Sequence, residues 1–338
     1  MTEGTAAVGS ILLGGVLLGS FTLPMKFARR WPWEATWLIY SLSALLIFPI
    51  GTAVLTLPSL SQIYLHSSTN ALLAAALFGF GWGIGSVLFG IGVARLGMSL
   101  GFSIILGVTA ALGSIIPMLV LAPSALASMK GAVLLLGLGI ILLGIYLCGV
   151  ASGIKEPAPG QAGLPSRRAL RTGLIICLLS GVGASMLNLA MAFGHDIAAR
   201  AATLGASPSN ASNAIWALAV ALGAFANVGY CLMLLIRNGT SRVLVAPRSA
   251  SHWWLAILMG ALWFSGVNVY GRGATALGTW GAVMGWPLLM AVMIVTANIL
   301  GWLTGEWRAA PRRASVLMVA GVTVLSMGVL VVGYSGAV

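Results

Sequence analysis

Long apolar runs recur along this chain from one end to the other. Runs of about 18 residues or more are typical of transmembrane α-helices, because a helix rises 1.5 Å per residue and a hydrocarbon core is about 30 Å thick. A transmembrane β-barrel would instead show alternating segments of about ten residues. The mean hydropathy of +1.05 and the charged fraction of 7% agree with a helical membrane protein.

The hydropathy pattern predicts an all-α membrane fold with ten spans. A basic linker rich in Pro and Gly, residues 151–171, separates a first five-helix repeat (1–150) from a second (172–338). The expected spans are residues 8–27, 34–57, 70–94, 97–122, 131–150, 172–194, 208–236, 252–271, 276–302 and 315–335.

Lys and Arg are distributed unevenly between the loops. The first, third, fifth, seventh and ninth loops hold 14 of the 17 basic residues. Cytoplasmic loops carry an excess of Lys and Arg, so we expect these loops in the cytoplasm, both termini outside and the protein in the inner membrane. The same distribution explains the net charge of +12, and we expect no nucleic-acid partner.

Two segments of the chain resemble each other at a constant offset of 181 residues, 79–97 and 260–278. They are GFGWGIGSVLFGIGVARLG and GALWFSGVNVYGRGATALG, with seven identical positions that include Trp82 and Trp263. Such blocks five helices apart have opposite orientations, which predicts an inverted-topology repeat. Secondary transporters with this architecture bind substrate near the midplane, between the repeats. We expect the glycines of both segments to allow close helix packing.

Enzyme and cofactor motifs are absent from the sequence. It contains no Walker A motif, so no ATP-driven pump is visible. Its three histidines and three cysteines show no metal-ligand spacing, and its five acidic residues are too dispersed for paired-carboxylate catalysis. We therefore expect neither an enzyme nor a cofactor or metal site.

Polar and aromatic residues inside the spans are the candidates for a binding site. Amides in hydrocarbon need partners, so they face other helices or a wet cavity. Tryptophans near the middle of a span lie outside the usual interfacial belt, and aromatic faces combined with amides suit a sugar. Helix packing is the alternative for each. We expect a cavity lined by the third, sixth, eighth and ninth spans, with a substrate site made of Trp82, Ser86, Asn188, Trp263, Asn268 and Trp286.

Two acidic residues are expected near membrane depth. Glu34 opens the second span, after the basic and aromatic stretch 26–33, and Asp196 ends the sixth. A proton-coupled carrier needs a shielded group that titrates. We predict that Glu34, and after it Asp196, serves proton coupling or gating. Helix capping is the alternative for Glu34, and an exposed loop position is the alternative for Asp196.

Three stretches, LPMKFARRWPWEATW (23–37), FGFGWGIGSVLFGIGVARLGMSLG (78–101) and GEWRAAPRR (305–313), resemble the L-rhamnose–proton symporter family of the drug/metabolite transporter superfamily. The resemblance runs through essentially the whole chain. It implies a ten-helix inner-membrane carrier that imports a deoxy sugar with a proton. The implied partners are a small sugar-like substrate, protons and the lipid bilayer. An exporter of lipophilic compounds with the same fold and a non-transporting membrane scaffold remain alternatives.

Overall fold

The computed structural model contains ten helical segments long and apolar enough to cross a membrane, which confirms the predicted number. It describes residues 3–28, 30–155, 167–246 and 249–335, and this part of the chain contains no β-strand. Two of the predicted cytoplasmic cations, Arg29 and Arg248, and most of the predicted linker, residues 156–166, lie outside the described residues.

The helices follow one another along the chain with short connections. The first half contains α1 (Glu3–Ser20), η1 (Leu23–Phe27), α2 (Trp33–Leu42), η2 (Ser43–Ile47), α3 (Phe48–Thr56), α4 (Leu60–His66), α5 (Thr69–Leu121), η3 (Pro123–Ala127) and α6 (Met129–Lys155). The second half contains α7 (Arg167–Phe193), α8 (His195–Thr203), α9 (Asn213–Asn238), η4 (Ser241–Leu244), α10 (Ala250–Ala276), α11 (Thr279–Leu303) and α12 (Arg312–Ser335).

Most predicted span boundaries differ from the structure by a few residues, and two of the differences concern how the chain turns. The third and fourth spans form the single element α5, which is interrupted at Gly97, where φ is 78° and ψ is 171°. The predicted start of the seventh span at residue 208 is wrong, because α9 begins at Asn213. Residues 208–212 form turns instead, and proline, serine and asparagine all favour turns.

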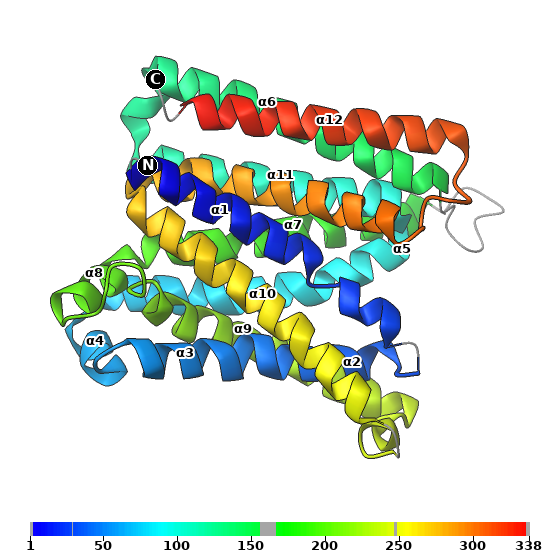
Figure 1. The fold of residues 1–338 in the computed structure, drawn as a ribbon, viewed down its shortest axis with the longest axis horizontal. Coiled ribbons are helices and arrows are strands. Elements are labelled where there is room, and N and C mark those ends of the chain that lie inside the picture. The colour runs from blue at the N-terminus through cyan, green and yellow to red at the C-terminus, as the bar shows by residue number, and fades with distance from the viewer. Residues whose placement is uncertain (1–2, 29, 156–166, 247–248, 336–338) are drawn as a thin grey trace.

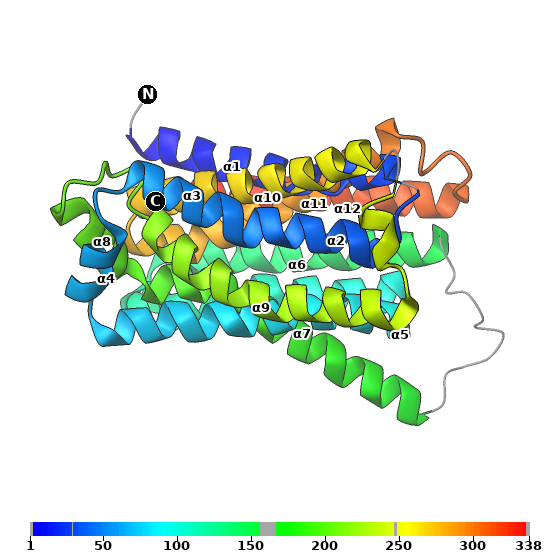
Figure 2. The ribbon, with the colours of Figure 1, turned by 90° about the horizontal axis from the view of Figure 1, so that it is seen from below.

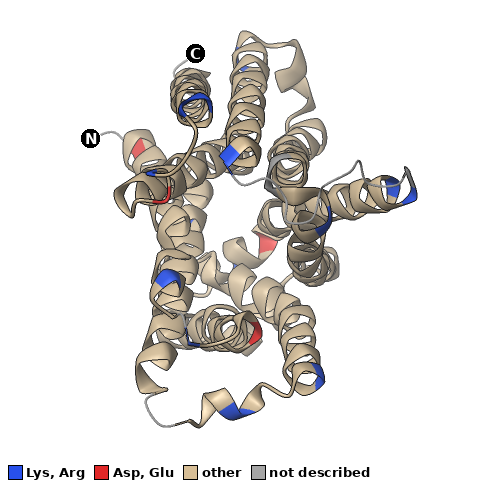
Figure 3. Ribbon diagram, turned by 90° about the vertical axis from the view of Figure 1, so that its right-hand side faces the viewer, with Lys and Arg blue, Asp and Glu red and all other residues tan. Residues whose placement is uncertain are grey.

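The spans run roughly parallel to one another in one bundle (Figure 1). α1 begins and α12 ends at the same end of the bundle, beside α4 and α8. We call this the even-loop end, formed by residues 57–68, 122–128, 204–212 and 277–278. The opposite, odd-loop end is formed by residues 30–32, 98–99, 239–246 and 304–311. Figure 3 looks onto the odd-loop end and shows Lys and Arg gathered there.

Helices of the first half of the chain pack mainly on helices of the second half. α1, in the first half, packs on α10 and α11 of the second half. α7, in the second half, packs on α5 of the first half, and α6 pairs with α12. α9 lies along the first part of α5 (Figure 2) and also contacts α2 and α3. The core is therefore built mainly between the halves.

Matching glycines of the two repeated segments face matching spans. A Cβ at Gly85 would meet Gly183 on α7, the sixth span, and one at Gly266 would meet Gly14 on α1, the first span. Only glycine allows backbones to approach this closely. In the same way, Gly79 faces the seventh span and Gly260 faces the second.

The last matched glycines, Gly97 and Gly278, both have positive φ, at 78° and 58°. L side chains are strained in that region, so glycine fits both turns. Gly97 separates the third span from the fourth, and Gly278 separates the eighth from the ninth. The chain therefore turns at the same place in both halves.

Candidate functional site

A cavity of about 910 Å³ lies between the two halves, in the part of the bundle nearer the odd-loop end. Its volume falls within the range of small-molecule sites, about 300–1,000 Å³. Its described walls come from α1, α2, α5, α7, α9, α10 and α11, and from the turn after α1, with no residue of α6 or α12 among them. The lining extends from Tyr270 and Trp286 at its inner end to Trp33, Arg95 and Asn298 near the odd-loop end.

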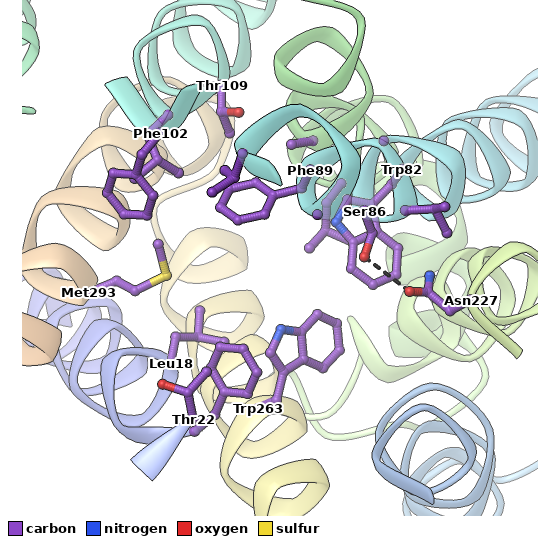
Figure 4. Close-up of a pocket in the computed structure, with 18 of the residues that line it drawn as sticks. Leu18, Thr22, Trp82, Ser86, Phe89, Phe102, Thr109, Asn227, Trp263 and Met293 are labelled. Atoms are coloured by element: carbon purple, nitrogen blue, oxygen red, sulfur yellow. Dashed lines mark hydrogen bonds between the residues drawn. The ribbon is translucent and has the colours of Figure 1, made fainter. Parts of the chain in front are cut away.

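Trp82 and Trp263 occupy matching positions of the repeated segments and stack on each other in this cavity (Figure 4). Their ring centroids are 5.3 Å apart, with an interplanar angle of 27°. The stack joins α5 of the first half to α10 of the second. Both side chains are largely buried, yet part of each ring faces the cavity.

The stack continues as an aromatic wall toward the odd-loop end. Tyr40 meets the edge of Trp263 at 6.5 Å, Trp37 lies 4.7 Å from Tyr40, and Trp33 stacks on Trp37 at 5.1 Å. The α2 residues Trp33, Trp37 and Tyr40 are spaced at i, i+4 and i+7, which places them on one face of a helix. We use the name aromatic wall for these three residues together with Trp82 and Trp263.

Asn227 is a polar residue that lines the cavity beside the aromatic wall. Its Oδ1 accepts hydrogen bonds from Ser86 Oγ at 3.1 Å (Figure 4) and from Trp37 Nε1 at 3.4 Å. Its Nδ2 donates to the backbone oxygens of Gly83 and Gly223. Asn227 thus fixes Ser86 and part of the aromatic wall. The sequence identifies it as an intramembrane amide but does not place it in the cavity.

Trp286 forms part of the inner end of the cavity. Its indole N–H donates to the backbone oxygen of Thr109 at 3.0 Å, and its ring meets Tyr270 edge-on at 5.9 Å. Gly113 makes room for the ring, since a Cβ there would lie 2.3 Å from the indole nitrogen. The ring is therefore held in one orientation by the fourth and eighth spans.

Asn188 lies behind the cavity wall and is fully engaged by protein groups. Its Nδ2 donates to the backbone oxygens of Gly113 at 2.6 Å and Ala282 at 2.9 Å, and its Oδ1 accepts from Tyr270 Oη at 2.5 Å. It is not among the lining residues. Asn188 therefore links α7, which carries it, to α5, α10 and α11.

Asn268 also lies away from the cavity lining. Its Nδ2 donates to Oδ1 of Asn213, whose own Nδ2 donates to Thr56 Oγ1 at 2.9 Å. This chain of bonds connects α10, α9 and α3 nearer the even-loop end. In the structure both asparagines hold helices together, which is the alternative to substrate binding that the sequence leaves open for them.

Replacing Asn188 with Leu is expected to lower protein stability by about 0.6–1.7 kcal/mol, the range measured for polar contacts between membrane helices. The substitution leaves Tyr270 Oη and two backbone oxygens without their partner. Thermal unfolding in detergent measures this loss. Asn298→Leu is the control, because the hydrogen bond of Asn298 within the described residues runs from Nδ2 to the backbone oxygen of Ile294 on its own helix. Equal melting temperatures for both variants would contradict the bridging role.

Glu34 is buried at the start of α2 and lies outside the described cavity lining. Its Oε1 accepts from Asn238 Nδ2 at 3.0 Å and from Thr240 Oγ1 at 2.9 Å. Within the described part of the chain, no Lys or Arg forms an ion pair with it. The carboxyl group thus connects the second span to the end of the seventh through neutral donors.

Asp196 lies at the even-loop end, in the first turn of α8. Its Oδ2 accepts from the backbone N–H of Ser68 at 2.7 Å, and its Oδ1 lies 3.7 Å from Nε of Arg200. Ser68 is the N-cap of α5. The carboxylate therefore satisfies a free donor at a helix start, as carboxylates commonly do.

A family model described as L-rhamnose-proton symport protein matches residues 5–338. The chain belongs to the L-rhamnose-proton symporter family. This family consists of transporters, so the protein is a transporter and not an enzyme. The assignment does not favour the exporter alternative.

Curated relatives align with nearly the whole chain. An L-rhamnose-proton symporter of Cronobacter sakazakii is 30% identical over 333 residues, covering 95% of this chain and 92% of that protein. Those of Klebsiella pneumoniae and Mannheimia succiniciproducens are 27% and 26% identical over 328 and 339 residues. These alignments cover 95% and 96% of this chain, and 93% and 98% of the two relatives.

Proposed function

We propose that this protein imports a sugar of the deoxyhexose class together with protons, by alternating access. The observation that carries the proposal is the stack of Trp82 on Trp263, because it joins the two halves and exposes aromatic faces inside a cavity of small-molecule size. Aromatic faces suit the apolar faces of a sugar ring. The names of the relatives, all L-rhamnose-proton symporters, support this substrate class.

Residues 1–150 and 172–338 are proposed to form an inverted repeat of the drug/metabolite transporter type. Two observations support this arrangement. The first helix of each half, α1 or α7, packs on helices of the other half, and matching glycines make matching contacts. In transporters built from such repeats, the substrate site lies between them and one half rocks against the other. The turns at Gly97 and Gly278 are then equivalent positions in the two repeats.

A partition between two cavities supports alternating access. The main cavity ends at Tyr270, and a second cavity of about 440 Å³ begins at Ala282, nearer the even-loop end. Asn188 bonds both of these residues. We infer that the structure represents a state open toward the odd-loop end, and that transport requires this partition to open as the other end closes.

The proposed substrate contacts are four of the sequence candidates, Trp82, Ser86, Trp263 and Trp286. All four line the cavity. Asn227 joins them, since it holds Ser86 through a hydrogen bond. We assign Asn188 and Asn268 to helix packing, because their amides are used by protein groups away from the lining.

The protein is proposed to lie in the inner membrane with its odd-loop end in the cytoplasm and both termini outside. The 14 of 17 basic residues in odd loops support this orientation. The cavity would then open to the cytoplasm in this state. Protease protection of a tag fused to the N-terminus tests the orientation, because a tag outside the membrane is digested in spheroplasts and a cytoplasmic tag is not.

Gradient-driven flux in proteoliposomes tests the transport function itself. We expect L-rhamnose to accumulate when the external medium is more acidic than the lumen, and the accumulation to stop when a protonophore collapses the gradient. Sugar uptake that ignores the gradient would contradict proton coupling. Efflux of hydrophobic cations without sugar uptake would instead indicate an exporter.

Glu34 is proposed as the proton-coupling group. Among the described residues it is the buried carboxyl group, and its chain neighbour Trp33 lines the cavity. We expect Glu34→Gln to keep sugar exchange across the membrane within about twofold, because the amide oxygen can still accept from Asn238 and Thr240. Accumulation driven by the pH gradient should fall at least about tenfold, since an amide cannot carry the proton.

Asp196→Asn provides the matched comparison. Its amide oxygen can still accept from the Ser68 N–H that the carboxylate caps, so exchange and accumulation are both expected to stay near the wild-type level. Loss of accumulation in D196N with normal accumulation in E34Q would assign the coupling role to Asp196 instead.

A further inference from the structure

Hydrogen-bond donors outnumber free acceptors in the main cavity. Trp82, Trp263, Tyr40 and Tyr230 line it, and each of these side chains carries one donor, an indole N–H or a hydroxyl group. Across the described residues, none of these four groups has a hydrogen-bond partner within the protein. An indole nitrogen can only donate. These groups are therefore available to a ligand that accepts hydrogen bonds.

The acceptors of the cavity are mostly used within the protein. Asn227 Oδ1 already accepts from Ser86 and Trp37. The acceptors that remain free are Asn298 Oδ1, near the mouth, and the oxygens of hydroxyl groups. Every hydroxyl group of a neutral sugar carries a hydrogen to donate. The remaining oxygens can accept from the hydroxyl groups of a neutral sugar and of a sugar acid alike, so the feature that favours an acid is the set of free donors and not a lack of acceptors.

The charge of the lining is positive. Neither Asp nor Glu is among the described lining residues, and the guanidinium of Arg95 is the charged group there. No ion pair to Arg95 occurs among the residues that the structure describes. The described acids at the odd-loop end have other partners, since Glu34 is held by Asn238 and Glu306 pairs with Lys26 at 2.5 Å. A cavity with one sign of charge concentrates ligands of the opposite sign.

We propose that the site also accepts a sugar that carries a carboxylate, such as an aldonic acid derived from a deoxy sugar. This inference rests on the proposed function and extends its substrate class. An ionised carboxylate only accepts hydrogen bonds, which matches the free indole and tyrosine donors. The carbon chain of the sugar acid packs on the aromatic wall.

Arg95 acts at a different depth from these donors. It lies 13 residues after Trp82 on α5, which corresponds to about 20 Å of helical rise. Even a long arginine side chain does not cover that distance. Arg95 therefore attracts the anion at the mouth of the cavity, while the indole and tyrosine groups hold the carboxylate further inside.

Competition and uptake in proteoliposomes containing the full-length protein test the proposal. The two probes are L-rhamnose, which is neutral, and L-rhamnonate, its aldonic acid. We expect L-rhamnonate to be taken up and to compete with L-rhamnose. We expect Arg95→Gln to lower L-rhamnonate uptake by about tenfold at low salt, at the lower end of electrostatic focusing effects, and to lower L-rhamnose uptake much less, because the attraction acts on the anion. Arg313→Gln is the control, because Arg313 is an exposed cation on α12, which is outside the lining.

Each other outcome has a distinct meaning. Uptake of L-rhamnose with neither uptake of nor competition by L-rhamnonate would overturn the proposal and leave the proposed function standing. Equal effects of R95Q on both probes, or equal effects of R95Q and R313Q, would overturn the role of the positive charge. If neither probe is transported, the proposed function fails, and this inference fails with it.

Discussion

Trp263→Ala is expected to reduce gradient-driven sugar uptake more than about tenfold while the protein still inserts into the membrane. The substitution removes one partner of the Trp82 stack and part of the aromatic wall. Fully burying a large apolar side chain is worth about 1.5–3 kcal/mol, and every 1.4 kcal/mol corresponds to about a tenfold change in affinity. Initial rates of uptake, normalised to the amount of folded protein, measure the effect.

Two further variants make this result specific. Trp254→Ala removes a tryptophan from the same helix, α10, but that side chain is 71% exposed at the bundle surface, so uptake is expected to stay unchanged. Trp263→Phe keeps an aromatic face and should retain intermediate uptake. Normal uptake by Trp263→Ala would remove Trp263 from the site, and a similar loss in Trp254→Ala would indicate a general effect of tryptophan removal.

The fold could be predicted in outline because hydropathy and length decide where a chain crosses a membrane. All ten predicted spans are present. The boundaries were harder to predict where a span and its loop share the same composition. The predicted end of the sixth span at residue 194 agrees with the end of α7 at Phe193. The helix that follows, α8 (His195–Thr203), was not among the predicted elements, because its nine residues are too few to span a membrane.

The site could be predicted only in part, because a sequence shows which residues lie in a span but not which partner each one meets. The repeated segments identified Trp82 and Trp263, and both line the cavity. Asn188 and Asn227 are both amides in mid-span, yet the structure places only Asn227 at the cavity. An amide that faces a wet cavity and one that bridges helices satisfy the same physical requirement, a hydrogen-bond partner.

Other residues of the cavity were assigned to the membrane surface by the sequence alone. Arg95 falls in the loop between the predicted third and fourth spans, and Trp33 belongs to the basic and aromatic stretch 26–33 before the second span. In the structure both line the cavity near its mouth. The spacing of Trp33, Trp37 and Tyr40 places the three side chains on one face of a helix. The sequence does not show whether that face of α2 is directed toward the other half or toward lipid.

Gly85→Ala is expected to destabilise the folded protein by at least about 1–3 kcal/mol, the usual cost of overpacking a core. A Cβ at Gly85 would lie 2.6 Å from the carbonyl carbon of Gly183 and 2.7 Å from its Cα. Both are backbone atoms, so no change of side-chain rotamer relieves the contact and α5 must separate from α7. The melting temperature in detergent and the yield of monodisperse protein measure this cost.

Gly266→Ala, at the matching position, tests the repeat and the argument about backbone contact together. Its Cβ would first meet Cγ of Leu18 at 2.7 Å and the backbone oxygen of Gly14 at 3.0 Å. Because a leucine side chain can adjust while a backbone cannot, we expect a loss in the same direction but smaller. Gly229→Ala, with nothing within 4 Å, should be neutral or stabilising by up to about 1 kcal/mol, since alanine is the better helix former. A melting temperature of Gly85→Ala at or above that of Gly229→Ala would show that the two halves do not depend on this close approach.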